Sequence, residues 1–169
     1  VHVENSPGYH FWMLGFLSKI VQPLSSLDNS LYLEASQMLE KASVYADYIT
    51  RPDGTVPAIG DTHAGVMFRK SSGLETKCFN GANQVIFRSP DDKVWAHFAS
   101  GYKTHVHKHC DNGSFNLFYC GKDVFIDPGF LNYENTEDSI AIKSARFHNT
   151  VSPVGEEQVI KEVDLSCPN

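Results

Sequence analysis

The sequence lacks several features that would define its class at once. It has no run of the roughly 20 apolar residues that span a membrane, and its best candidate, residues 9–21, is too short and contains Lys19. Its four cysteines form no CxxC pair and are too sparse for a disulfide scaffold. It also lacks a basic excess, because 20 Asp and Glu outnumber 14 Lys and Arg. We therefore expect no membrane span and no nucleic-acid partner.

The composition is that of a folded protein. Of the 169 residues, 41% are hydrophobic and 20% are charged, which is enough apolar material to build a buried core. The chain opens on Val1 rather than Met, and motif-like residues follow at once. We expect it to be a piece of a longer protein.

Residues 6–50 have helical periodicity. Ser6 followed by Pro7 is typical of a helix start, and Pro23 predicts the end of the first helix. A second run then places apolar side chains at helical spacing, which predicts a helical hairpin. These side chains are Leu31, Ala35, Met38, Ala42, Tyr45 and Ile49.

The periodicity changes after the segment RPDGTVPAIGD, residues 51–61, which is rich in proline, glycine and aspartate. Beyond it, short runs rich in β-forming residues alternate with turn residues and predict an antiparallel β-sandwich. The runs are 65–70, 83–89, 93–100, 114–120, 123–128 and 147–153. The chain is thus expected to have an α+β fold, with a helical domain over 1–60 and the start of a sandwich over 61–169.

The stretch HVHKHCDNGSF, residues 105–115, concentrates histidine. In an extended strand, His105, His107 and His109 would lie on one face, and two further candidates, Asp127 and His148, could complete a tetrahedral metal site. Alternatively, the histidines form a solvated polar face, Asp127 is an ordinary turn residue, and His148 is a hydrogen-bonded core residue.

A cupin-like oxygenase is a further alternative for the same stretch. Gly101, His107, His109 and Gly121 match the first cupin motif, but Ser114 stands where that motif requires a glutamate ligand, and no second cupin motif follows.

The segment HVENSPGYH, residues 2–10, gathers polar residues before the first helix. The helix dipole there favours an anionic ligand such as a carboxylate. The alternative is that Asn5 and Ser6 only cap the helix.

Five motifs together resemble the heparinase II/III-like family of polysaccharide lyases. The motifs cover nearly the whole chain and are, in order, HVENSPGYH, PDGTVPAIGD, HKHCDNGSF, GKDVFIDPG and RFHNTV. The resemblance implies an α/α-toroid joined to a multi-sheet antiparallel β-sandwich, of which this chain would hold the last toroid helices and the first sandwich strands. It also implies a structural zinc bound by His109, Asp127 and His148.

The same resemblance implies a substrate and site residues. The substrate would be an acidic polysaccharide containing a uronic acid, cleaved by β-elimination. His107 is similar to the family's active-site histidine, and His2 to the histidine that faces the substrate carboxylate. Glu4 and Asn5 would neighbour that carboxylate, and Tyr133 would supply a second hydroxyl. The family also points to a periplasmic or secreted protein of bacterial type.

The chain departs from the family pattern at one position. Where the family carries a tyrosine that acts as base and acid, this sequence has Val56, and no tyrosine lies between Tyr48 and Tyr102. Either His107 with Tyr133 or another tyrosine does that work, or the protein is a relative that binds or helps process a polysaccharide during its synthesis. Exposed helix faces are expected to make the isolated piece poorly soluble or homo-oligomeric.

Overall fold

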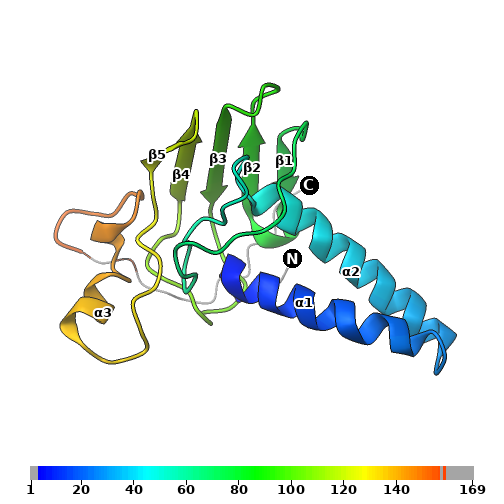
Figure 1. Cartoon of the computed structure of the whole chain (residues 1–169). Coiled ribbons are helices and arrows are strands. Elements are labelled where there is room, and N and C mark those ends of the chain that lie inside the picture. Colours follow the sequence, from blue (N-terminus) through cyan, green and yellow to red (C-terminus); the bar gives the residue numbers. More distant parts are fainter. Residues whose placement is uncertain (1–3, 157, 159–169) are drawn as a thin grey trace.

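In the computed structural model, a pair of helices leads into a five-stranded antiparallel sheet (Figure 1). The structure describes residues 4–156 and 158. The helices are α1 (Pro7–Leu24), α2 (Asn29–Ile49) and the short α3 (Glu137–Ala141), with 3-10 turns η1 (Asn80–Ala82) and η2 (Ala145–Phe147). The strands are β1 (Lys77–Phe79), β2 (Gln84–Arg88), β3 (Val94–Ala99), β4 (Ser114–Tyr119) and β5 (Lys122–Phe125).

The two long helices form the predicted hairpin, but their ends differ in detail from the expectation. Pro23 lies inside the last turn of α1, which ends one residue later. Ser6 stands at the N-cap, but its side chain makes no capping hydrogen bond, because its hydroxyl lies 2.9 Å from the Thr62 hydroxyl. Asp28 does cap α2, since its carboxylate accepts hydrogen bonds from the backbone of Ser30 and Leu31. Neither α1 nor α2, the long helices of the described residues, is long and apolar enough to cross a membrane.

The strands follow one another in the order β1-β2-β3-β4-β5, and every neighbouring pair is antiparallel. The predicted α+β fold with an antiparallel sheet is confirmed, whereas the domain boundary at residue 60 stays a prediction. Two predicted strands are wrong. The run 65–70 has only an isolated bridge from Met67 to Thr55. The run 147–153 begins at the last residue of η2 and continues without regular secondary structure.

The core lies where the base of the helical hairpin meets the sheet. Its buried side chains are Tyr45, Ile49, Ile59, Ile86, Trp95 and Phe118. The Trp95 indole donates a 3.0 Å hydrogen bond to the Tyr48 carbonyl, and the buried Arg88 guanidinium donates to the Thr50 carbonyl. These bonds satisfy polar groups at the C-terminus of α2 and fix the helix to β2 and β3.

The predicted apolar face of α2 is buried only near its C-terminus. Tyr45 and Ile49 are 3% and 0% exposed, while Leu31 and Met38 are 51% and 54% exposed. The reason is geometric, because the far end of the hairpin extends beyond the sheet, as Figure 1 shows.

Gly60 lies where the N-terminal segment meets the loop between β3 and β4. Its φ is +53°, and an added Cβ would lie 2.7 Å from the Asn5 carbonyl oxygen and 3.1 Å from that of His107. Both neighbours are backbone atoms, so a side chain would force the segments apart. We expect Gly60→Ala to lower the free energy of unfolding by about 1–3 kcal/mol.

Thermal or urea denaturation measures this effect. Gly15→Ala is the matched control, because Gly15 lies within α1 and has nothing within 4 Å of its added Cβ. Alanine there should be neutral or stabilise by up to about 1 kcal/mol. Equal effects of the two substitutions would contradict the prediction.

Candidate functional site

The histidine-rich stretch is a loop between β3 and β4, so the predicted extended strand is wrong. His107 has a φ of +54°, which interrupts the alternation that a strand requires. The Asn5 side-chain amide holds the loop by donating to the Thr104 carbonyl at 2.7 Å and the Val106 carbonyl at 2.9 Å. The turn nevertheless directs His107 and His109 toward one carboxylate, that of Asp61.

Three buried residues from separate segments form a cluster suited to a metal ion. Ligand atoms of His109, Asp127 and His148 all lie within 4.8 Å of one another. His109 comes from the β3–β4 loop and His148 follows η2. Asp127 comes after β5, where its Oδ1 accepts a 3.0 Å hydrogen bond from the Gly129 backbone. The structure therefore brings together the three residues that the sequence singled out as metal ligands.

Two nitrogens of this cluster have no hydrogen-bond partner among the described residues. They are Nδ1 of His109 and Nε2 of His148, and both are buried. Each ring uses its other nitrogen, because His109 Nε2 lies 2.9 Å from Asp61 and His148 Nδ1 lies 3.1 Å from Asp127. A buried polar atom without a partner is costly. Two imidazole nitrogens beside a carboxylate are a donor set that suits zinc.

Asp61 links the cluster to the neighbouring histidine. Its side chain is 2% exposed, its Oδ1 is 2.9 Å from His109 Nε2, and its Oδ2 is 2.6 Å from His107 Nδ1. Burial alone would raise the pKa of Asp61, but hydrogen bonds from His109 and His107 lower it to about 2. An ionised carboxylate only accepts hydrogen bonds, so both histidines donate to it.

His107 lies among two tyrosines and a glutamate. The Tyr9 ring stacks on the imidazole at 4.0 Å between centroids, and the Tyr133 hydroxyl lies 3.1 Å from His107 Nδ1. The two tyrosine hydroxyls are 2.7 Å apart, and Glu4 Oε2 lies 3.6 Å from His107 Nε2. Burial, followed by the hydrogen bond to Tyr9, raises the pKa of Tyr133. Tyr133 therefore keeps its proton at neutral pH.

The other sequence candidates have mixed outcomes. Glu4 and Tyr133 both reach His107, whereas the side-chain nitrogen of Asn5 is committed to the backbone of the β3–β4 loop. His2 lies outside the described residues. Val56 is 3% exposed and its backbone N–H donates to the Val66 carbonyl, and its side chain carries no group that could transfer a proton.

Sequence reasoning missed two residues of the site. Tyr9 lies within the polar segment HVENSPGYH, and its hydroxyl is 2.7 Å from that of Tyr133. Asp61 ends the motif PDGTVPAIGD and was treated only as part of a boundary segment. A signal for both existed, because each lies inside a motif that matched the family.

The region 72–164 matches a model of the family described as "Heparinase II/III-like, C-terminal". The chain belongs to this family. The fold agrees, since the heparan sulfate lyase HepC mutant from Pedobacter heparinus superposes with a TM-score of 0.73 at 19% identity. A structure of heparinase III superposes with a TM-score of 0.72 at 18% identity. No curated protein sequence matches significantly.

The match covers most of this chain but a minor part of the heparinase-like structures. It includes 88% of this chain and 29% of HepC, and 95% of this chain and 33% of heparinase III. The chain therefore spans about a third of the length of these proteins or less.

Asp61→Asn should uncouple the two histidines that share the Asp61 carboxylate. An amide cannot accept charge-assisted hydrogen bonds from both rings, so the orientation of His109 in the metal cluster is lost. We expect zinc affinity to fall about 10- to 100-fold. Competition with a chromophoric chelator measures it.

Asp47→Asn is the matched control for this experiment. That carboxylate accepts from Arg69 at 2.8 and 2.9 Å, outside the site, so zinc affinity should stay at the wild-type value. An unchanged affinity in Asp61→Asn would show that the bond to His109 does not support metal binding.

Proposed function

We propose that this chain forms part of the active site of a polysaccharide lyase that cleaves a uronic-acid-containing glycan by β-elimination. The observation that carries the proposal is the set His107, Tyr9 and Tyr133, in which an imidazole and two phenol hydroxyls lie within hydrogen-bond or stacking distance. Membership of the heparinase II/III-like family supports the same reaction class.

The hydrogen bonds assign a role to each nitrogen of His107. Nδ1 carries the proton because it faces the ionised carboxylate of Asp61 at 2.6 Å. Nε2 therefore keeps its lone pair and is the basic atom. It lies on the side of Glu4 and not toward the buried cluster. Asp61 thus holds the ring in the tautomer that a general base needs.

The reaction then needs one base and one acid. Nε2 of His107 takes the proton from C5 of the uronate, and the electron pair of that C–H bond forms the C4–C5 double bond. The C4–O bond breaks, and the Tyr133 hydroxyl gives its proton to the departing oxygen. Tyr133 suits this step because its raised pKa keeps it protonated until the transfer, and the Tyr9 hydroxyl lies 2.7 Å from it.

We further propose that His109, Asp127 and His148 hold a structural zinc ion. Support comes from the burial of all three, their mutual proximity and the two unpartnered imidazole nitrogens. When bound, the ion would tie together the β3–β4 loop, the end of β5 and the segment after η2. Its contribution is to fix the loop that carries His107.

A non-catalytic relative that binds or helps process a polysaccharide is the second candidate. The observation that favours it is the buried Val56, which leaves the segment 51–61 without a hydroxyl in the site. Binding would then use the same surface around His107, without proton transfer.

Incubation of the full-length protein with alginate, heparan sulfate and other uronate polymers tests the lyase proposal. β-Elimination leaves an unsaturated sugar that absorbs in the ultraviolet, so absorbance should rise with time. Binding of a polymer without any such rise would favour the second candidate and reject the lyase.

A further inference from the structure

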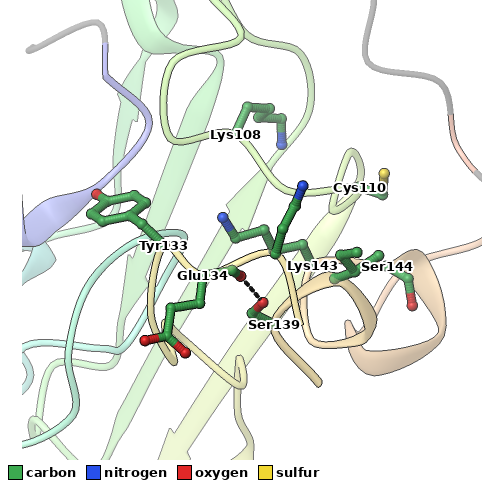
Figure 2. A pocket seen from close by; sticks show the side chains of 9 residues that line it. Lys108, Cys110, Tyr133, Glu134, Ser139, Lys143 and Ser144 are labelled. Atoms are coloured by element: carbon green, nitrogen blue, oxygen red, sulfur yellow. Dashed lines mark hydrogen bonds between the residues drawn. The ribbon is translucent and has the colours of Figure 1, made fainter. Parts of the chain in front are cut away.

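A cavity of about 390 Å³ adjoins the site on the far side of Tyr133. It lies between the β3–β4 loop and the segment around α3, and Figure 2 shows the side chains that line it. Its polar lining includes Lys108, Tyr133, Ser139 and Lys143. The volume lies within the range of small-ligand sites. An anionic occupant would pair with the partly exposed ammonium of Lys143, because the ammonium of Lys108 already pairs with Asp111.

Lys143 lies between the cavity and the histidine site. Its ammonium is 5.6 Å from the centroids of both the Phe130 and Tyr133 rings, and its nearest carboxylate oxygen, on Asp61, is 4.0 Å away. Asp61 already accepts hydrogen bonds from two histidines. The aromatic rings thus hold the ammonium beside the cavity, where its ion pair among the described residues is the 4.0 Å contact to the shared Asp61, and the side chain is 34% exposed.

Lys108 is the second lysine that lines the cavity. Its side chain is 5% exposed, it pairs with Asp111, and its ammonium lies 5.4 Å from the centroid of the Tyr102 ring. It is therefore fixed in place rather than free to move with solvent. The one acidic side chain of the lining, Glu134, points away from both lysines in Figure 2.

We propose that this cavity is a subsite for an acidic substituent, a carboxylate or a sulfate, on the sugar next to the one that reacts at His107. Lys143 is its principal contact. The assignment rests on the proposed function, because Tyr133 borders both the cavity and His107. A lysine ammonium is a point charge that binds planar and tetrahedral oxyanions alike. The cavity is therefore suited to either a carboxylate or a sulfate, which share a negative charge carried on oxygen atoms.

Lys143→Met in the full-length, zinc-loaded protein tests the subsite. A contact outside the reacting sugar contributes to substrate binding, so KM for the preferred polymer should rise about 10- to 100-fold while kcat changes little. Lys143→Arg should restore most of the loss. Lys122→Met is the matched control, because this lysine lies on β5 and is exposed and remote from the cavity lining.

Comparison of heparan sulfate with its desulfated form separates the two sources of charge. A KM rise limited to the sulfated polymer assigns sulfate, and a rise on alginate, in which every sugar carries a carboxylate, assigns the carboxylate. An unchanged KM on every polymer, or a fall in kcat alone, overturns the subsite. Thermal denaturation checks folding, and Lys143→Gln, which retains much of the reach of the side chain, is the second variant.

The test also separates this proposal from the lyase proposal. If the wild-type protein binds a polymer without cleaving it, the affinity of each variant is measured by calorimetry instead. Lys143→Met must then weaken binding by the same factor. Equal affinities of wild type and variant overturn the subsite independently of any catalytic activity.

Discussion

His107→Gln is expected to lower the lyase rate of the full-length protein by about 100- to 10,000-fold. Glutamine keeps a polar side chain in the loop, but its amide cannot accept the C5 proton. The carboxylate of Asp61 would also lose the 2.6 Å hydrogen bond that orients the base. The measurement is the initial rate of ultraviolet absorbance on the preferred polymer.

His105→Gln is the control, because that exposed histidine lies two positions away in the same loop. It should change the rate by less than a few-fold. Tyr133→Phe provides the complementary test, since it keeps the ring against Phe130 and removes only the hydroxyl. A His107→Gln protein with nearly full activity would exclude His107 as the base.

If zinc occupies the proposed site, its removal is expected to produce the second large effect, on stability. A ligand that binds only the folded state adds about 4 kcal/mol at 1,000 times its Kd. For a unit of this size that corresponds to a fall in Tm of about 8–16 °C when a chelator strips the zinc. The buried nitrogens of His109 and His148 would then lack the partner that the ion supplies.

His148→Ala gives an independent route to the same state. This variant should bind no zinc, show the lowered Tm without chelator, and change no further when chelator is added. His105→Ala should respond to the chelator like the wild type. If the chelator leaves the wild-type Tm unchanged and elemental analysis finds no zinc, the proposed metal centre is wrong.

The sequence predicted the elements whose pattern is local. The helical hairpin follows from apolar spacing, and β2 to β5 follow from short β-rich runs bounded by turns. The run 65–70 has similar composition but finds only one bridge, at Met67. A strand requires a partner as well as propensity, and composition does not show whether that partner is present.

The part of the site that depends on residue type, the metal ligands, was predicted from the sequence. The part that depends on backbone geometry and distant contacts was missed. His109, Asp127 and His148 are distinctive metal-ligand types, and the structure places them together. The positive φ of His107 is invisible in a sequence, so the alternating histidines predict a strand where the structure has a loop. Asp61 and Tyr9 were missed because their partners lie 46 and 124 positions away.

The contact between Tyr9 and Tyr133 has a consequence for the order of folding. Their hydroxyls meet although the two residues are 124 positions apart, and closing so long a loop costs entropy that only nearly complete structure repays. The helical hairpin can form early from local contacts, whereas the phenol pair can close only after the start of α1 and the segment after β5 are both in place. In a refolding experiment, far-ultraviolet helix signal should therefore recover before any signal that reports the tyrosines.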